Sequence, residues 1–212
     1  MTNKIDHFAI GAANLDDGVA ALQHSLGVTV PRGSKHAAMS THNCVMQAGN
    51  GSFLEILAND PEAPHPGRHR WFGLDDPATR SRLAKRPHAL CWVVATEDLD
   101  NFVANSPVDL GEVVLFTRGE RSWRLTVPVD GSLPEQGLIP AFIEWSPGAH
   151  PSTNMTDLGV SLESVNLCHP RPDELRQVLQ SLGVDHLARV SSGDAKLSFT
   201  LKSPSGALIT LD

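Results

Sequence analysis

The stretch KIDHFAIGAANLDDGVAALQHSLGV, residues 4–28, sets a pattern that returns along the chain. It predicts a strand over residues 4–11 and then a helix over residues 15–26. Asn14 is a favourable helix N-cap and Gly27 a favourable stop, which supports these bounds. Three further strands are expected after the helix: a short one near 28–30, and two joined by a glycine-rich turn, at 42–48 and 52–58. The order is strand, helix and three strands, a βαβββ module.

The module repeats. The segments LDDGVAALQHSLGV (residues 15–28) and PDELRQVLQSLGV (residues 172–184) share an acidic first turn, a Leu-Gln pair and a terminal Ser-Leu-Gly-Val. Helices of similar length resemble one another by chance, but the surrounding strands recur in the same order, which favours a true repeat. We therefore expect βαβββ modules at 1–59 and 88–150, a third, degenerate module at 151–212, and a connecting segment with a possible lid at 60–87.

One βαβββ module cannot bury its helix face and its sheet face alone. Modules must therefore pair, so that their sheets curl around a shared cavity. The sequence predicts an α+β fold in which repeated modules form a curved mixed sheet or open barrel around a cup, with the helices outside. Because three is an odd number, either one copy packs differently or a second chain completes the set, and we expect a homodimer.

Composition narrows the class of protein. The chain has 212 residues, 41% hydrophobic and 19% charged, a balance typical of globular domains, and its formal charge of −7 argues against nucleic acid as a partner. The first residues do not resemble a signal peptide, and no stretch approaches the roughly 20 apolar residues of a membrane span. Cys44, Cys91 and Cys168 lie far apart in apolar segments, as reduced core cysteines do. We expect a cytoplasmic protein with no membrane partner.

Two carboxylates have unusual settings. Glu55 shares a strand face with Phe53 and Leu57, and the string FLEIL recurs as FIEWS around Glu144. An ionised carboxylate among apolar side chains needs a metal, a cation or a proton. With His7 on a neighbouring strand, Glu55 and Glu144 form a candidate site for a divalent ion. The alternative is that each glutamate lies on a solvent-facing surface.

Several segments resemble a known superfamily. IDHFAIGAANLDD, GSFLEILANDP, LIPAFIEWSPGAHPS and CHPRPDELRQVLQSLG, together with the repeated module order, resemble the glyoxalase-like branch of the vicinal oxygen chelate superfamily, which includes glyoxalases, bleomycin resistance proteins and extradiol dioxygenases. The resemblance covers nearly the whole chain. It implies the fold and a small-molecule pocket, but this superfamily includes isomerases, lyases, dioxygenases and metal-free binding proteins, so the fold does not fix the reaction.

The resemblance also implies a ligand set. Its usual metal ligands are a His or Gln in the first strand and a Glu in the last strand of each paired module. His7 and Glu55 match in the first module and Glu144 in the second, where the first-strand position falls on Ala89, one residue from His88. In the third module Ser164 and Thr210 stand at these positions and cannot supply the usual ligands. The set is thus incomplete, as at a catalytic metal with an open position or a site that has lost its metal.

Four other side chains are candidate substrate contacts: His36, Asn43, Trp123 and Arg121. The ordinary alternatives are loop hydrogen bonding for the first two, and a core tryptophan beside a solvated arginine for the others. Trp92 and Trp145 are interpreted as core residues. The segment 60–76 lacks strand or helix periodicity and is a candidate lid, with Trp71 and Phe72 closing the cup.

Two main functions compete. The first is a glyoxalase-like enzyme that performs divalent-metal-assisted lyase, isomerase or dioxygenase chemistry on a small oxygenated metabolite, with Glu55 or Glu144 as metal ligand or catalytic base. The alternative is a metal-free binding or resistance protein that uses the same cup for a hydrophobic or aromatic small molecule. A third interpretation is an interaction module whose cup is vestigial. The set His7, Glu55 and Glu144 favours the enzyme, whereas the doubtful fourth ligand and the degenerate third module favour the other two interpretations.

Overall fold

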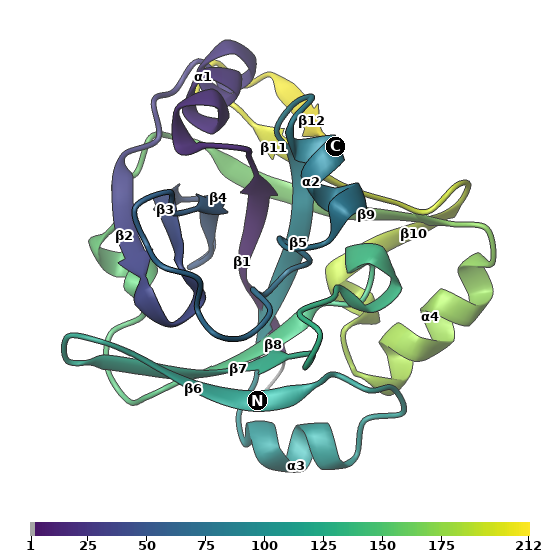
Figure 1. Ribbon diagram of the computed structural model, residues 1–212. Helices are drawn as coiled ribbons and strands as arrows, with labels where there is room; N and C mark the ends of the chain where they lie inside the picture. Colours follow the sequence, from purple (N-terminus) through teal and green to yellow (C-terminus); the bar gives the residue numbers. More distant parts are fainter. Residues whose placement is uncertain (1–2) are drawn as a thin grey trace.

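The chain folds into an eight-stranded and a four-stranded β-sheet with four α-helices, in a computed structural model that describes residues 3–212 (Figure 1). The predicted α+β class is confirmed, because the larger sheet is mixed and curls into a half-barrel. Within residues 3–212, no helix has both the length and the apolar character needed to cross a membrane.

The first unit has the predicted βαβββ order. Its helix α1 begins after Asn14, whose side chain accepts a hydrogen bond from the Asp17 amide at 2.9 Å, and ends at Gly27, where φ is 74°. The elements are β1 (Lys4–Gly11), α1 (Leu15–Leu26), β2 (Arg32–His36), β3 (Thr41–Gln47) and β4 (Phe53–Asn59). The short strand expected near 28–30 instead lies at β2, since Val28 and Val30 pack in the core while the polar segment RGSKH pairs with β3 at the sheet edge.

The second unit follows a connecting segment that contains one short helix, α2 (Pro77–Leu83). Its elements are β5 (His88–Ala95), α3 (Leu99–Ala104), β6 (Glu112–Arg118), β7 (Arg121–Val127) and β8 (Ala141–Trp145). All of these lie within the predicted module 88–150.

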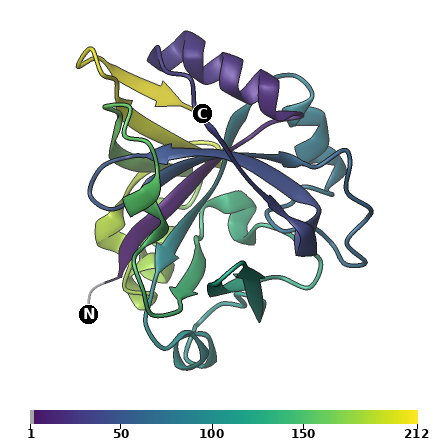
Figure 2. The ribbon, with the colours of Figure 1, turned by 90° about the vertical axis from the view of Figure 1, so that its left-hand side faces the viewer.

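The two units join in one sheet through their first strands. The strand order is β2-β3-β4-β1-β5-β8-β7-β6, with β1 antiparallel to β5 at the centre. Within each unit the first strand is parallel to the last, β1 to β4 and β5 to β8. The sheet curls around the cup, with α1 and α3 outside it at opposite ends of the molecule (Figures 1 and 2).

The third unit keeps the order of elements along the chain but not the order of strands in the sheet. Its elements are β9 (Ser161–His169), α4 (Pro172–Ser181), β10 (Ala188–Ser192), β11 (Lys196–Lys202) and β12 (Leu208–Leu211). The sheet order is β10-β9-β11-β12, so β9 pairs with β10 and β11 rather than with the last strand. This copy therefore packs differently from the other two, one of the two arrangements that the odd number of modules allows.

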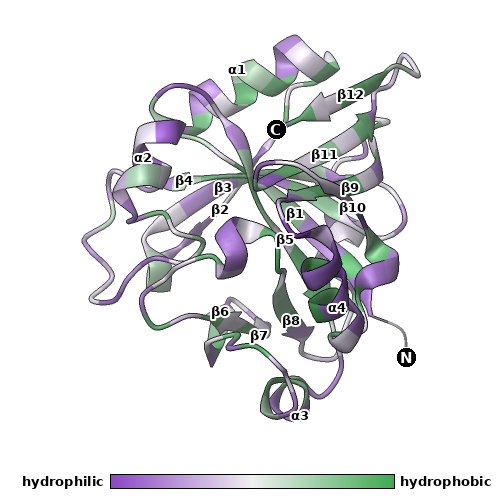
Figure 3. Ribbon diagram, turned by 90° about the vertical axis from the view of Figure 1, so that its right-hand side faces the viewer, coloured by the Kyte–Doolittle hydropathy of each residue, from purple (hydrophilic) through white to green (hydrophobic). Residues whose placement is uncertain are grey.

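The two faces of the large sheet have separate cores. Its outer face shares one core with the four-stranded sheet, where the rings of Phe8 and Phe199 lie 4.7 Å apart. In Figure 3, β1 and β5 run beside β9 and β11, with hydrophobic residues along these strands. The inner face has a second cluster that includes Trp71, Phe72 and Trp123. This second cluster forms much of the cup wall.

Candidate functional site

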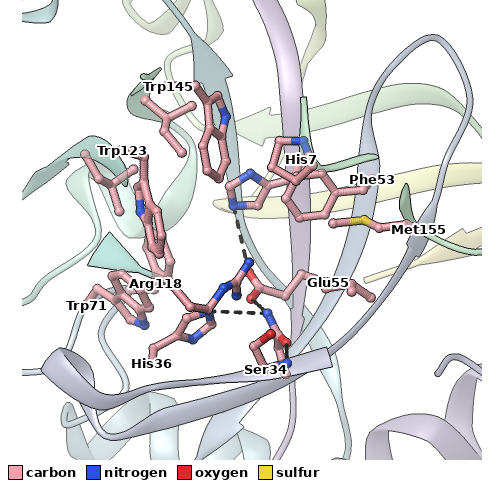
Figure 4. Close-up of a pocket in the computed structure, with 16 residues that line it drawn as sticks. His7, Ser34, His36, Phe53, Glu55, Trp71, Arg118, Trp123, Trp145 and Met155 are labelled. Carbon is pink, nitrogen blue, oxygen red and sulfur yellow. Dashed lines mark hydrogen bonds and ion pairs between the residues drawn. The ribbon is translucent and has the colours of Figure 1, made fainter. Parts of the chain in front are cut away.

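The cup contains a pocket of about 580 Å³, a volume that includes its open mouth (Figure 4). Its aromatic wall comprises Phe53, Trp71, Phe72, Trp123 and Trp145. Its polar groups are His7, Ser34, His36, Asn43, Glu55 and Arg118. An apolar enclosure with a few convergent polar groups is the usual form of a small-molecule site.

A bulge in β1 lets the adjacent residues Asp6 and His7 interact, with His7 in the pocket and Asp6 behind its wall. Pairing with β5 shifts by one residue between Ile5 and His7, so Asp6 is an extra residue in the strand. The Asp6 Oδ1 atom lies 2.6 Å from His7 Nδ1. Because a carboxylate only accepts, His7 donates its Nδ1–H, and the other ring nitrogen, Nε2, is left to face Glu55.

Asp6 is wholly buried and holds a network behind the pocket wall. Its Oδ2 atom accepts hydrogen bonds from Trp145 Nε1 at 2.7 Å and from His150 Nε2 at 2.9 Å. Burial tends to raise the pKa of Asp6, but the hydrogen bonds from His150 and His7 outweigh it and hold this pKa well below its usual range. Asp6 is thus a permanent anion that fixes the orientation of both imidazoles.

Glu55 forms the opposite side of the polar centre. It is 5% exposed, its Oε2 atom lies 3.8 Å from His7 Nε2, and its Oε1 atom accepts a hydrogen bond from Asn43 Nδ2 at 2.6 Å. Asn43 in turn accepts from the Ser34 amide at 2.7 Å. The gap between the His7 and Glu55 atoms exceeds a hydrogen bond, so both groups can act on a ligand.

His36 lies beside this pair as a neutral group. Its Nδ1 atom is 3.1 Å from the Thr41 hydroxyl, and its Nε2 atom is 3.4 Å from Asn43 Nδ2. Burial lowers the pKa of His36 to about 4, against a small opposing effect from the Glu55 charge. Both His36 and Asn43 line the pocket, and substrate contact by either stays a prediction.

Arg118, at the end of β6, supplies the pocket's one arginine or lysine side chain in the part of the chain described. Figure 4 shows it reaching toward Glu55 and His7, and its guanidinium carbon lies 5.7 Å from the centre of the Trp123 ring. Burial, followed by the charge of Arg121, lowers the pKa of Arg118. Of the other two candidate substrate contacts, Trp123 lines the pocket, whereas Arg121 lies outside it, on the outer rim with Glu120 and Asn154.

Glu144 differs most from its expected position. Residues on either side of it, Ile143 and Trp145, line the pocket, so alternation along β8 places Glu144 on the outer face. There its Oε2 atom accepts hydrogen bonds from the Leu99 amide at the start of α3 and from Arg124 Nη2, both at 2.7 Å. The segments FLEIL and FIEWS are therefore similar in sequence, but their glutamate side chains lie on opposite faces of the sheet. Glu144 does not join His7 and Glu55 in the pocket.

Three further expectations concern His88, Trp145 and the lid. His88 lies at a separate cleft near α2 and donates its Nδ1–H to the Ala89 carbonyl at 2.9 Å. Trp145, expected in the core, lines the pocket instead, while Trp92 is fully buried as predicted. Trp71 and Phe72, from the connecting segment, do form part of the pocket wall.

A divalent ion, which the family resemblance implies, finds only part of its ligand set here. His7 and Glu55 lie in the pocket, but Glu144 faces away. Among residues 3–212, no three or more His, Cys, Asp or Glu side chains are arranged to hold a metal ion. Structural and catalytic zinc sites use at least three protein ligands, and the Arg118 charge beside Glu55 competes with a cation. The residues present do not fit a resident ion of that kind.

Sequence reasoning missed three residues of the site: Asp6, Arg118 and His150. Asp6 was hidden because strict alternation assigns it to the face opposite His7, and only the bulge reverses this. Arg118 and His150 lie at the end of a strand and in a loop, where periodicity carries no signal. The one available signal was the adjacent pair Asp-His in an otherwise apolar strand, because a buried Asp requires hydrogen-bond donors.

Comparison with known proteins establishes the family. The sequence profile of the glyoxalase-like domain family matches residues 5–183, most of the chain. The protein belongs to this family, which confirms the resemblance seen in the sequence. No curated protein matches the sequence.

A solved structure of similar fold matches the whole chain. A hypothetical protein from Staphylococcus aureus is similar over 100% of this chain and 99% of its own, with a TM-score of 0.67 and 14% sequence identity. Methylmalonyl-CoA epimerase from Mycobacterium tuberculosis matches 68% of this chain and 88% of its own, with a TM-score of 0.43 and 16% identity. A variant of the Streptomyces coelicolor methylmalonyl-CoA epimerase, in complex with 2-nitronate-propionyl-CoA, matches 71% and 98%, with a TM-score of 0.41 and 18% identity. At 14% identity, the similarity to the Staphylococcus aureus protein concerns the fold alone.

Proposed function

We propose that this protein is an enzyme that moves a proton on a small oxygenated metabolite, with His7 and Glu55 as the acid–base pair. The observation that carries the proposal is the geometry around His7. Asp6 accepts the Nδ1–H at 2.6 Å, and Nε2 faces Glu55 Oε2 at 3.8 Å across the pocket. A buried carboxylate behind an imidazole orients the ring and stabilises the imidazolium that forms when it takes a proton.

The arrangement suits proton transfer at carbon beside a carbonyl group. One of the two groups takes the proton from carbon, and the proton then returns, from that group or after transfer to its neighbour across the 3.8 Å gap, to a different carbon or to a leaving group, which gives an isomerase or a lyase. The aromatic walls exclude water, so charges within the pocket interact more strongly than in solvent. General acid–base groups of this kind typically contribute a factor of about 10² to 10⁴ in rate.

The test is exchange of substrate hydrogen with solvent. Small 2-oxo and 3-oxo acids are incubated with the protein in D₂O, and deuterium incorporation is followed by NMR. We expect wild-type protein to catalyse exchange of at least one compound, and His7→Gln and Glu55→Gln each to lower the rate about 100-fold or more. Glu163→Gln, on an exposed carboxylate of β9, is the control and should exchange at the wild-type rate. Equal exchange rates in all four proteins would refute the proposal.

Metal assistance, implied by the resemblance, is examined in the same experiment. The exchange assay is repeated after treatment with a chelator and after adding Mn, Fe, Co, Ni or Zn ions, and metal content is measured in wild-type and Glu55→Gln protein. We expect chelation to leave the exchange rate unchanged. Loss of exchange on chelation, restored by one ion that Glu55→Gln fails to bind, would establish His7 and Glu55 as metal ligands instead.

A metal-free binding protein is the second candidate, favoured by the aromatic lining of the pocket. The two candidates differ in one result. A binding protein retains its ligand unchanged and shows no solvent exchange in any variant, whereas the enzyme exchanges hydrogen and loses this activity in His7→Gln.

A further inference from the structure

The environment of Arg118 is unusual for a charged side chain. It is the last residue of β6, it lines the pocket and its side chain is partly buried. Among residues 3–212 its guanidinium forms no direct hydrogen bond or ion pair, and its central carbon lies 5.7 Å from the centre of the Trp123 ring. A partly desolvated cation without an anion is unfavourable, so this position favours binding of an anionic ligand.

Glu55 acts on Arg118 through its charge but makes no direct contact with the guanidinium. Its two carboxylate oxygens are directed to Asn43 Nδ2 at 2.6 Å and toward His7 Nε2 at 3.8 Å, and neither lies within 4.0 Å of the guanidinium as an ion pair would require. Arg118, His7 and Glu55 all line the pocket, and Figure 4 shows the Arg118 side chain directed toward the other two. A ligand there contacts the cation at one end and the acid–base pair at the other.

The charge of the pocket suits a ligand with one negative charge. Arg118 is the permanent cation among the lining residues, His36 is neutral because burial holds its pKa at about 4, and Glu55 adds a carboxyl group. A dianionic phosphate would meet one cation beside an acidic side chain. A carboxylate carries a single charge, and its planar shape matches the two-pronged donor face of a guanidinium.

The remaining surface suits a flat ring. Trp71, Trp123 and Trp145 line the pocket in series, with the centroids of Trp123 and Trp145 5.4 Å apart. Phe53 lies on the other side and stacks on His7, with ring centroids 4.5 Å apart. Aromatic rings bind other aromatic rings in offset or edge-to-face geometry, beyond what their apolar area contributes.

We infer that the natural ligand of this pocket is a small aromatic carboxylate, whose carboxylate group binds Arg118 and whose ring lies among the tryptophans. This inference deepens the proposed function, because it names the substrate class for the His7–Glu55 pair. It makes Arg118 a specificity-determining residue, whereas His7 and Glu55 act on the carbon between the ring and the carboxylate or next to it.

Isothermal titration calorimetry with three matched compounds tests the inference. Phenylacetate carries the ring and the charge, phenylacetamide lacks the charge, and cyclohexylacetate lacks the aromatic ring. We expect phenylacetate to bind wild-type protein about tenfold or more tightly than either of the others. Arg118→Gln should lose the preference for phenylacetate over phenylacetamide, while Arg118→Lys should keep part of it because the charge remains.

Arg121→Gln is the matched control. Arg121 pairs directly with Arg118 across the β6–β7 hairpin but lies outside the pocket, so the variant loses the same charge nearby and should bind phenylacetate as the wild type does. Equal loss in the two glutamine variants, equal affinity for phenylacetate and phenylacetamide, or no saturable binding of phenylacetate would each overturn the inference.

The titration is independent of the proposed reaction. His7→Gln should still bind phenylacetate, since its carboxylate contact lies at Arg118. If wild-type protein prefers the carboxylate but exchanges no hydrogen in any compound, the ligand class stands and the proposed enzyme is refuted. If exchange occurs but Arg118→Gln shows the same ligand preferences as the wild type, the proposed enzyme stands and the inferred ligand class is refuted.

Discussion

Asp6 is wholly buried and accepts hydrogen bonds from three side chains, His7, His150 and Trp145. It links the first strand of the first unit to the last strand of the second unit and to the loop that follows that strand. Because a buried carboxylate without such donors would be strongly destabilising, this one residue fixes both the tautomer of His7 and the position of the Trp145 wall.

Asp6→Asn should destabilise the protein at neutral pH by about 1–3 kcal/mol, because the amide cannot accept all of these hydrogen bonds. The pKa of Asp6 is lower in the folded state, so its carboxylate stabilises the fold above the unfolded pKa of about 3.9, and this stabilisation is lost as pH falls below that value. The difference in unfolding free energy between wild type and Asp6→Asn should therefore narrow between pH 5 and about pH 3, measured by urea unfolding.

The control for this prediction is Asp194→Asn, on an exposed aspartate in the turn before β11. Its unfolding free energy should stay within about 0.5 kcal/mol of wild type at each pH. A constant difference between wild type and Asp6→Asn across the acid range would contradict the role given to the Asp6 charge.

His36 makes a separate prediction about pH. Its pKa of about 4 in the folded protein lies below the unfolded value of about 6.5, so the unfolded state takes up a proton first as pH falls. Wild-type stability should therefore decline relative to His36→Gln between pH 6.5 and about pH 4, and level off below that. NMR titration of the His36 ring is the direct check, and an ordinary titration near 6.5 would show that the ring is not buried as described.

At the scale of elements, most helices and strands could be predicted, although α2 in the connecting segment was not, while the orientation of side chains within strands could not. The helix α1 begins after Asn14 and ends at Gly27, as these capping residues predicted. A strand of only five residues such as β8 has too few alternations to fix which face is buried, and the match of FIEWS to FLEIL favoured the wrong one for Glu144. The position of β2 was predicted wrongly because its polar residues lie at an exposed edge and show no alternation.

Because Glu55 and Glu144 lie on opposite faces of the sheet, the same substitution at the two positions should have different effects. Glu144→Gln should leave phenylacetate binding and solvent exchange unchanged, because Glu144 lies on the outer face and binds the Leu99 amide and Arg124. It should lower the unfolding free energy by about 0.5–2 kcal/mol, since a charged acceptor at the first turn of α3 is lost. Glu55→Gln, measured in the same assay, should lower the rate of solvent exchange. Loss of exchange in Glu144→Gln would return this residue to the site.

At the scale of the whole molecule, two βαβββ units build the cup and the third supports it from behind. Their first strands, β1 and β5, contribute to the inner hydrophobic cluster on one face and to the core shared with the four-stranded sheet on the other. The sequence predicted three units and a cup, but the packing of the third depends on long-range contacts that no local pattern encodes. Homodimer formation stays a prediction, to be checked by sedimentation of the purified protein.

This shared core predicts that the two sheets unfold together. Phe8 and Phe199 are each fully buried, and their ring centroids lie 4.7 Å apart across the two sheets. Phe199→Ala should lower the unfolding free energy by about 3–5 kcal/mol, because it removes a large side chain and leaves a cavity behind β1. Leu208→Ala, at a 65% exposed position in the same four-stranded sheet, should change it by no more than about 0.5 kcal/mol.

Denaturant unfolding followed by tryptophan fluorescence reports on the cup, since all four tryptophans precede the third unit. A shift of the fluorescence midpoint by Phe199→Ala would show that the rear sheet stabilises the pocket. Two separate transitions, with the fluorescence midpoint unmoved, would mean that the cup folds without its support.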